Sequence, residues 1–183
     1  ACAADQEVVA DDMCMATVPD LTGDVTATDN CTASGALTVT QDPAAGTLFG
    51  GAHGDTQVVT LTVTDEFGNT STCEAVLTLV DQTDPMIDCS AIPTTVSADP
   101  GQCGYAITDA SFDAILMDNC EATLTHDYAA APSNTTLNGT TLPVGITTIT
   151  FTATDENGNT ASCSVDIEET DDEDRTFVTC PQD

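Results

Sequence analysis

Oxygen-bearing side chains gather in a turn that this chain contains twice. The stretch TVTDEFGNTSTC at residues 62–73 returns as TATDENGNTASC at residues 152–163, so each copy places an aspartate, a glutamate and an asparagine close together. Each repeat also carries an Asp-Asn pair directly before a cysteine, at residues 29–31 and 118–120. Carboxylate and amide oxygens are the ligands of calcium and similar hard cations, which take about six to eight of them.

These side chains predict two cation sites, one at the distal end of each repeat. The linker VDQTDP at residues 80–85 adds two aspartates to the first site, and an acidic run follows the second. The first predicted ligand set is Asp29, Asn30, Asp65, Glu66, Asn69, Asp81 and Asp84. The second is Asp118, Asn119, Asp155, Glu156, Asn159 and Asp171. We therefore expect calcium as a structural cofactor that makes the junction between modules rigid.

A simpler interpretation of each turn stays open. Asp and Asn side chains accept hydrogen bonds from the backbone amides of turns, and Gly-Asn suits a tight hairpin without any metal. The charge balance favours the cation, because 31 acidic residues face a single basic one, Arg175, for a formal net charge of −30. Carboxylates that no lysine can neutralise repel one another, so cations must compensate them.

The same charge excludes whole classes of partner. Nucleic acids and anionic membrane surfaces would be repelled by so acidic a chain. The apolar runs are far shorter than the roughly 20 residues that span a bilayer, so no membrane insertion is expected. Because 40% of the residues are hydrophobic and lie in short periodic runs, a folded core is expected rather than disorder. The opening ACAADQEVV is typical of a mature or trimmed terminus.

Nine cysteines follow the same repeat as the turns. The first four return 87 to 90 residues later, and the ninth stands where a third repeat would begin. So many cysteines without CxxC or CxxH spacing indicate disulfides in an oxidising compartment rather than a zinc site, and hence a secreted or cell-surface protein. In order they are Cys2, Cys14, Cys31 and Cys73, then Cys89, Cys103, Cys120 and Cys163, then Cys180.

Alternating apolar residues and threonines predict the strands that carry the turns. A period of two with threonine on the wet face is typical of half-buried antiparallel strands. Each repeat should therefore end in a hairpin whose last strand directs its cysteine into the core of a β-sandwich. The residues expected on the buried faces are Val59, Leu61, Val63, Cys73, Ala75, Leu77 and Leu79, with Ile149, Phe151, Ala153, Cys163, Val165 and Ile167 in the second copy.

The second repeat resembles a known family. Its IDCS, DPGQCG and DNC motifs, followed by LPVGITTITFTATDENGNTASCSVDI, are similar to those of the hyalin repeat (HYR) domain, an immunoglobulin-like module of extracellular adhesive and matrix proteins. The first repeat keeps DNC and TVTDEFGNTSTC but has FGGAHGDTQ and MCMA where the family has a Pro-Val-Gly turn and GQCG, so it resembles a divergent member. The resemblance implies an all-β chain of two tandem immunoglobulin-like β-sandwiches. Their expected bounds are 1–83 and 84–170, and residues 171–183 form an acidic tail.

Four cysteines in each repeat allow three pairings, so the spacing alone decides nothing. In a sandwich the first strand can lie beside the last, which favours Cys89–Cys163 and leaves Cys103 for Cys120. By the repeat, the corresponding prediction for the first module is Cys2–Cys73 and Cys14–Cys31. Each bridge should contribute about 2 to 4 kcal/mol to stability.

Cys180 is left without a partner by this scheme. One interpretation is that the sequence stops just inside a further module of a longer protein. The other is that the tail RTFVTCPQD, with Phe177 and Val178, supplies a strand or a disulfide to a neighbouring subunit. A contact of that kind does not close on itself, so it builds a filament.

Other residues carry weaker predictions. His53 is expected in a loop and His126 in a strand, and neither belongs to an arrangement of nucleophile and base, so no catalysis is expected. Asn134 and Asn138 lie in N-x-Ser/Thr sequons and are candidate glycosylation sites. The sequons at Asn30 and Asn69 overlap a predicted disulfide and a predicted metal turn.

Together these features predict an extracellular structural protein, the repeating subunit of a surface fibre built head to tail from calcium-stabilised domains. The alternative is an adhesion module whose loops near residues 43–57 and 129–145 bind a protein or a glycan, although few aromatic residues are present to stack on sugars. A third alternative is a pair of accessory domains from a secreted enzyme.

Overall fold

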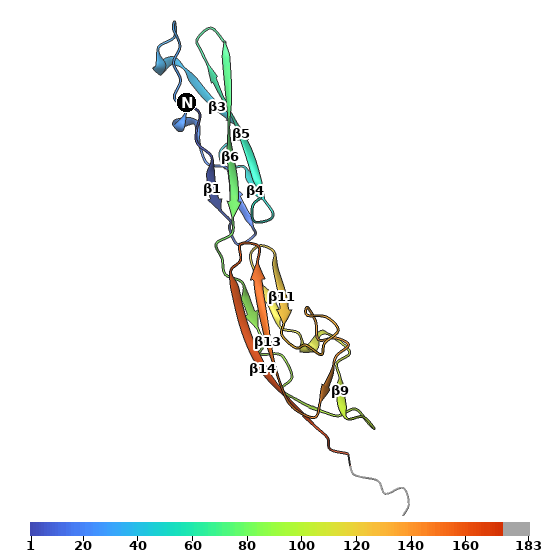
Figure 1. The fold of residues 1–183 in the computed structure, drawn as a ribbon. Coiled ribbons are helices and arrows are strands. Elements are labelled where there is room, and N and C mark those ends of the chain that lie inside the picture. The colour runs from blue at the N-terminus through green and yellow to red at the C-terminus, as the bar shows by residue number, and fades with distance from the viewer. Residues whose placement is uncertain (174–183) are drawn as a thin grey trace, which may run out of the picture. The chain divides into compact units, whose positions relative to one another are not determined.

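The computed structural model describes residues 1–173 and shows an all-β protein (Figure 1). Two compact units divide the chain. Unit 1 comprises Ala1–Asp84 together with two short later segments, Asp118–Glu121 and Asp155–Asn159, and unit 2 comprises Pro85–Met117, Ala122–Thr154 and the chain from Thr160 onward. The main segment of unit 1 ends at Asp84, and the sequence placed the boundary between residues 83 and 84. The return of two segments from the second repeat to unit 1 was not predicted.

Unit 1 is built on a four-stranded sheet in the order β1-β6-β5-β3 and a two-stranded sheet of β2 and β4. Its strands are β1 (Gln6–Val9), β2 (Met15–Thr17), β3 (Thr38–Asp42), β4 (Leu48–Gly50), β5 (Thr56–Thr64) and β6 (Thr70–Val80), with two 3₁₀ turns, η1 (Thr22–Asp24) and η2 (Ser34–Ala36). β5 and β6 form the predicted antiparallel hairpin, with Leu61 opposite Cys73, and β1 runs parallel to β6 on its other edge.

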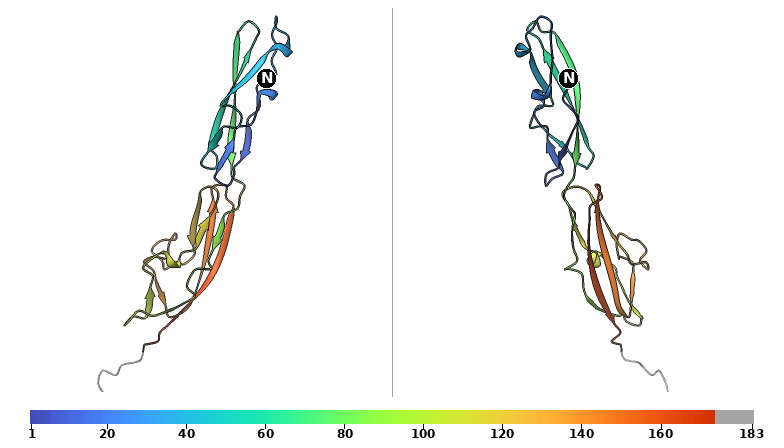
Figure 2. Two further views of the ribbon diagram at one scale, coloured as in Figure 1. Left: turned by 180° about the vertical axis from the view of Figure 1, so that it is seen from behind. Right: turned by 60° about the vertical axis from the view of Figure 1, so that its left-hand side comes forward.

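Unit 2 repeats this plan. Its main sheet has the order β11-β13-β14-β8, and two-stranded sheets pair β10 with β7 and β12 with β9. The elements are β7 (Met86–Asp88), β8 (Thr95–Ser97), β9 (Gly104–Ala106), η3 (Ala110–Phe112), β10 (Ile115–Met117), β11 (Ala122–His126), β12 (Thr141–Pro143), β13 (Gly145–Asp155) and β14 (Thr160–Thr170). The β13–β14 hairpin corresponds to β5–β6, and both hairpins can be followed in Figures 1 and 2. Each unit is thus an immunoglobulin-like β-sandwich, as the sequence predicted.

The alternating residues of the two hairpins fill the cores. Val59, Leu61, Ala75, Leu77 and Leu79 are fully buried in unit 1, and Cys73 packs against them. In unit 2 the corresponding face carries Ile149, Phe151, Val165 and Ile167, with Cys163 packed alongside. Threonines take the opposite faces of the strands, where β-branched side chains suit a pleated surface. Val63 is only half-buried; it lies close to the β5–β6 turn, opposite Ser71.

Three disulfides are present among the described residues. Cys2–Cys73 and Cys89–Cys163 join the first and fourth cysteines of each repeat, the pairing predicted above. The other two predicted pairings, Cys14–Cys31 and Cys103–Cys120, are wrong. Cys14 bonds instead to Cys120, and Cys31 and Cys103 are free and exposed. Cys180, Phe177 and Val178 lie outside the described residues.

The physical reason for the wrong pairings is distance along the strands. The loop that carries Cys14 lies at the end of β6, where the Ala10 amide donates to the Val80 carbonyl. Cys31 follows Asp29, which lies beside the β5–β6 turn. β6 has 11 residues, and at about 3.3 Å per residue its ends are roughly 35 Å apart. The Cα atoms of bonded cysteines must lie within about 7 Å, so Cys14 and Cys31 cannot bond.

The buried ring of Phe151 provides a test of the unit 2 core. Phe151→Ala should lower the free energy of unfolding by about 3 to 5 kcal/mol, because the cavity it leaves can collapse only in part. Ile146→Ala on the same strand is the control, since Ile146 is 70% exposed and its loss should cost less than about 0.5 kcal/mol. Denaturant unfolding measures both, and equal costs would contradict the assigned register.

Candidate metal centre

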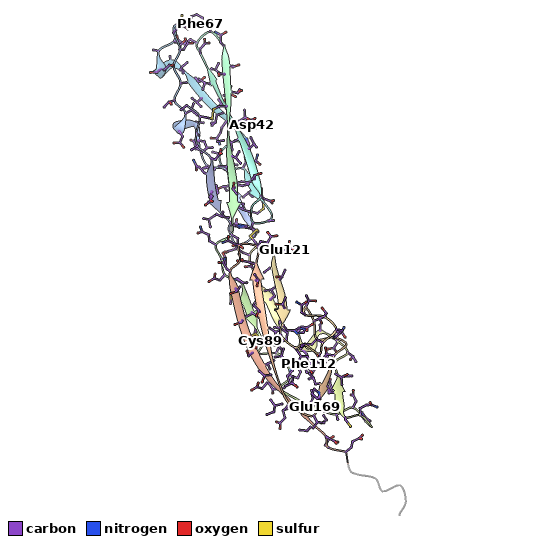
Figure 3. All side chains as sticks on the ribbon, viewed as in Figure 1. Asp42, Phe67, Cys89, Phe112, Glu121 and Glu169 are labelled. Carbon is purple, nitrogen blue, oxygen red and sulfur yellow. A yellow bond between two sulfur atoms is a disulfide. The ribbon has the colours of Figure 1, made fainter. Side chains whose placement is uncertain are left out.

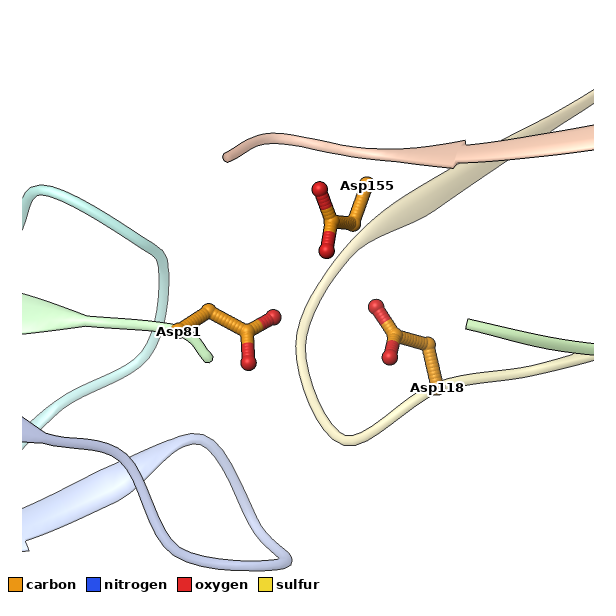
Figure 4. A group of neighbouring side chains, drawn as sticks. All are labelled: Asp81, Asp118 and Asp155. Carbon is orange, nitrogen blue, oxygen red and sulfur yellow. The ribbon is translucent and has the colours of Figure 1, made fainter. Parts of the chain in front are cut away.

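Three aspartates meet inside unit 1. Asp81 follows β6, Asp118 lies just after β10, and Asp155 is the last residue of β13 (Figure 4). One carboxylate oxygen from each of them lies within 4.8 Å of one from each of the others. All three residues were predicted as cation ligands, but in two separate sites.

The cluster is buried and poorly satisfied within the described residues. Asp81 has no exposed surface, and its Oδ1 accepts from the Thr83 amide while Oδ2 has no hydrogen-bond partner. Both carboxylate oxygens of Asp118 and Oδ1 of Asn119 are also buried without a partner. Burying unpaired carboxylates is costly, so the arrangement calls for a positive charge.

Several bonds hold the aspartates in place. The amide of Asp81 donates to Nδ1 of His53, so this ring nitrogen is the acceptor and fixes the loop that His53 was predicted to occupy. Nδ2 of Asn157 donates to the Asp81 carbonyl at 2.9 Å. Nδ2 of Asn119 donates to the Asp11 carbonyl at 3.0 Å. The neighbouring Cys14–Cys120 disulfide joins the same two segments covalently.

The electrostatics of the cluster are unfavourable without a cation. Burial raises the pKa of Asp118 above its ordinary value of 3.8, and the negative charges of Asp81 and Asp155 raise it further. The described residues include no lysine or arginine, because the single basic side chain of the chain is Arg175. Repulsion within the cluster is therefore not relieved by a protein charge.

Asp155 has two roles at once. Its Oδ1 accepts from the amide of Asn159 and its Oδ2 accepts from Nδ2 of the same residue, both at 2.8 Å. Those bonds close the β13–β14 turn, as the metal-free interpretation of the Asp-Glu-x-Gly-Asn motif predicts. Each carboxylate oxygen keeps a further lone pair, so Asp155 can still face the cluster.

The donor set suits a hard divalent cation. Calcium binds oxygens at about 2.3 to 2.6 Å, so two ligands on opposite sides of one ion are roughly 4.8 Å apart. The observed limit of 4.8 Å is therefore compatible with three carboxylates around a single ion. The cluster offers no imidazole or thiolate, which transition metals such as zinc prefer.

Apart from Asn119, the remaining predicted ligands do not join this cluster. The prediction that Asp29, Asp65 and Asn69 converge with Asp81 is wrong, because β6 separates the β5–β6 turn from Asp81 by the length of the sandwich. Asn30 and Glu66 follow Asp29 and Asp65 in the same two loops and are exposed. Asp84, Glu156 and Asp171 are exposed as well, and Asn159 contacts the cluster only through Asp155.

At the β5–β6 turn the motif acts as a backbone clasp. Oδ1 of Asp65 accepts from the amides of Phe67 and Asn69, Oδ2 accepts from Nδ2 of Asn69, and Gly68 takes the left-handed conformation with φ of 86°. These bonds hold the pKa of Asp65 below 3.8, the Asn69 side chain having the largest effect. Asp29 beside it has a lowered pKa, because the amides of Cys31 and Thr32 donate to its carboxylate.

A groove of about 400 Å³ lies beside this turn in unit 1. It is lined by residues 25–29, by Leu37, Val63 and Asp65, and by the start of β6. The loops near residues 43–57 and 129–145, predicted as ligand-binding loops in the alternative, do not line it.

The other singled-out residues have structural surroundings. His126 ends β11, packs edge-on against Phe151 with ring centroids 5.9 Å apart, and accepts from the Tyr128 amide through Nδ1. Asn134 and Asn138 are exposed, which a glycosylation acceptor requires.

Comparisons with known proteins support part of this description. The HYR domain family matches residues 80–168, which is the second repeat. The first repeat is not included in that match. Together with the three disulfides, the similarity indicates an extracellular module. No helix within residues 1–173 is long and apolar enough to cross a membrane.

Solved structures with similar chains include two-domain and longer protocadherin fragments. Human mucin-like protocadherin EC1-2 is 12% identical with a TM-score of 0.41, covering 93% of this chain and 98% of its own. Human protocadherin-24 EC1-2 is 12% identical with a TM-score of 0.37, covering 91% and 95%. The protocadherin gammaB7 EC3-6 cis-dimer structure is 15% identical with a TM-score of 0.36, covering 92% of this chain and 46% of its own, so the present chain spans about half of it.

Replacing one carboxylate should relieve the repulsion in the cluster. Asp118→Asn should raise the melting temperature of the metal-free protein by a few degrees at neutral pH. Because the pKa of Asp118 is raised in the folded state, its ionisation makes the folded protein less stable as pH rises through that pKa. The asparagine side chain of the variant cannot ionise, so this loss does not occur. Calorimetry in excess chelator measures the change. Asp84→Asn, at an exposed aspartate outside the cluster, is the control and should have little effect.

The clasp at the β5–β6 turn predicts a titration. Asn69→Ala should raise the pKa of Asp65 towards 3.8, because the largest stabilising bond to its carboxylate is lost. The bonds to the Asp65 carboxylate stabilise the folded protein at pH values above the pKa of this group in the unfolded chain. This stabilisation is lost as pH falls through the lower pKa of the folded state. An NMR titration of the Asp65 carboxyl carbon measures the shift, and an unchanged pKa would contradict the clasp.

Proposed function

We propose that this protein is an extracellular structural subunit whose domains are stabilised by calcium and which assembles head to tail into a surface fibre. The observation that carries the proposal is the buried cluster of Asp81, Asp118 and Asp155. It joins side chains from both sequence repeats in one unit and leaves their negative charges unpaired. A catalytic centre would instead bring together a nucleophile, a base and a binding cleft.

Calcium is the ligand that fits this cluster best. The proposed ligands are one or both oxygens of Asp118, Oδ2 of Asp81, a free lone pair of Asp155 and Oδ1 of Asn119. Water and backbone carbonyls would complete the about six to eight oxygens that the ion takes. Three carboxylates and one divalent ion leave a net charge near −1, which removes most of the repulsion.

The structural role follows from how the chain is reinforced. The three disulfides of residues 1–173, together with the proposed cation, would stabilise small sandwiches that contain no tryptophan and few other aromatic residues. The Cys14–Cys120 bond also links one sequence repeat to the next covalently. Such cross-linking of repeats suits a protein that bears mechanical load outside the cell. We propose that the main partner of this protein is a second copy of the same chain.

A second candidate is an adhesion module that binds a protein or a glycan. The groove beside Asp65 favours it, because a cavity of about 400 Å³ can hold a small ligand. Its lining contains no Phe, Tyr or Trp, so a sugar would lack an aromatic platform.

Calcium binding predicts a shift in stability. At about 100 times its dissociation constant, calcium should stabilise the protein by about 2.7 kcal/mol, which raises the melting temperature by about 5 to 10 °C. Asp81→Asn should abolish most of this rise, because Asp81 is fully buried in the cluster. Calorimetry with and without calcium measures it, and Glu156→Gln in the adjoining turn is the control that should keep it.

The fibre role is tested by electron microscopy of the purified 183-residue protein in calcium and in chelator. Filaments with one subunit per repeat are expected in calcium. Monomers at high protein concentration with calcium bound would contradict the fibre and favour the adhesion module, and a glycan or protein library screened against the same sample would then identify its ligand.

A further inference from the structure

Two exposed thiols of the described chain match a disulfide that the chain already contains. Cys14–Cys120 joins the second cysteine of the first repeat to the third cysteine of the second repeat. The free cysteines are Cys31, the third of the first repeat, and Cys103, the second of the second repeat. Cys31 and Cys103 therefore occupy the same two repeat positions as Cys120 and Cys14, but neither has a partner within the described chain.

The loop around Cys103 begins and closes like the loop around Cys14, although it is one residue longer. The amide of Ala10 donates to Val80 at the end of β6, and the amide of Ala98 donates to Thr170 at the end of β14. The next amide along the chain closes each loop, from Asp11 to Met15 and from Asp99 to Gly104. The loop of Cys103 thus stands at the end of β14 as the loop of Cys14 stands at the end of β6.

The loop around Cys31 likewise matches the segment that carries Cys120. Both have the sequence Asp-Asn-Cys, and both lie beside the aspartate of an Asp-Glu-x-Gly-Asn turn. Asp118 is within the cluster of Asp155, and Asp29 lines the same groove as Asp65. The loops of Asp29 and Asp65 therefore carry the same aspartates, asparagines and cysteine as residues 118–120 and 155–159, except that Phe67 replaces Asn157.

The carboxylates at the end of unit 2 complete the parallel. Asp171 follows β14 as Asp81 follows β6, but Asp171 is exposed whereas Asp81 is covered. Glu169, labelled in Figure 3, lies two residues before Asp171, as the core residue Leu79 lies two residues before Asp81. Its side chain is 2% exposed, and neither carboxylate oxygen has a partner within the described residues. The end of unit 2 thus carries an aspartate in the position of Asp81, with a buried glutamate beside it, but without the loops that cover Asp81.

We propose that Cys103 of one copy forms a disulfide with Cys31 of a second copy, so that this contact repeats between chains the Cys14–Cys120 arrangement within them. Asp29 and Asp65 of the second copy would then lie beside Asp171 of the first around a shared cation. The inference rests on the proposed fibre function and deepens it by naming the residues of the joint, which are not the predicted Cys180. Because the two surfaces differ, each copy uses both and the chain of subunits stays open.

The covalent step is a disulfide exchange. A Cys31 or Cys103 thiolate attacks a small oxidised disulfide such as oxidised glutathione and forms a mixed disulfide, releasing one glutathione thiolate. The thiolate of the other cysteine then displaces the second glutathione. Two protein thiols lose two protons and two electrons in total, and one glutathione disulfide is reduced to two thiols.

One position departs from the parallel. Phe67 stands where Asn157 donates to the Asp81 carbonyl, and its ring is 75% exposed. A phenyl ring cannot donate that hydrogen bond, so at the proposed joint this position supplies apolar contact instead. The two acidic surfaces also repel each other, so calcium belongs in the assembly reaction.

The test uses the Cys180→Ser protein throughout, so that only the two exposed thiols of the described chain are available. Incubation with calcium and a glutathione redox buffer should give a ladder of multimers on a non-reducing gel, which collapses to one band on reduction. Peptide mass spectrometry of the ladder should find Cys31 linked to Cys103 between differently isotope-labelled copies.

Two further variants test the polarity of the joint. Cys31→Ser and Cys103→Ser should each remain monomeric when incubated alone. An equimolar mixture of the two should form a dimer and no higher band, because the mixture contains one Cys103 and one Cys31 per pair. The melting temperature is the control for correct folding. Both variants keep the three disulfides of the described residues, so both should melt at the same temperature as the parent protein.

Three results would overturn the proposal. They are a Cys31–Cys103 link within one copy, links between identical cysteines, and a protein that stays monomeric in the redox buffer. Electron microscopy of the Cys31→Ser protein separates this failure from that of the fibre function. Filaments that form without the Cys31 thiol would leave the fibre standing and remove this joint from it. If the protein with both thiols forms no filaments under any condition, the fibre is rejected.

Discussion

The repulsion among Asp81, Asp118 and Asp155 is the interaction on which the organisation of unit 1 depends. Their oxygens lie within 4.8 Å of one another in a buried position, and no basic side chain of the described residues is available to neutralise them. At such distances and away from bulk water, like charges are expensive to hold together. The segments that carry Asp118 and Asp155 can stay on unit 1 only if other bonds or a cation outweigh this repulsion. Cys14–Cys120 and the side-chain bonds of Asn119 and Asn157 are those other bonds.

The Asp-Glu-x-Gly-Asn turn serves two purposes with the same residues. At Asp65 and at Asp155 the carboxylate binds the backbone and side chain of the following asparagine, so the hairpin closes without a metal. The aspartate of such a turn is already oriented and partly desolvated, so little further ordering is needed to bind a cation. At Asp155 the other two carboxylates are present, and at Asp65 only Asp29 lies nearby. Within one copy, the same motif is thus a turn at Asp65 and a metal ligand candidate at Asp155.

The disulfides divide by what they connect. Cys2–Cys73 and Cys89–Cys163 lie within single repeats and staple the first strand region to the last. Cys14–Cys120 closes a span of 106 residues and joins the repeats. In the chain-entropy account a longer closed loop restricts the unfolded chain more, so this bridge has the largest expected effect on stability. Because each repeat carries both halves of this joining pair, one half remains free at Cys31 and the other at Cys103.

The sequence alone determined the strands, the two-sandwich fold, the hairpins and the types of residue that could bind a cation. It could do so because alternation with period two and turn residues such as Gly68 act over a few neighbouring residues. It did not determine which aspartates meet or which cysteines bond. Asp29 and Asp81 belong to the same repeat yet lie at opposite ends of an 11-residue strand, whereas Asp118 comes to Asp81 from another repeat. Such groupings depend on how folded segments pack across long stretches of chain, so only the tertiary structure decided that Cys14 bonds to Cys120 and that Asp155 faces Asp81.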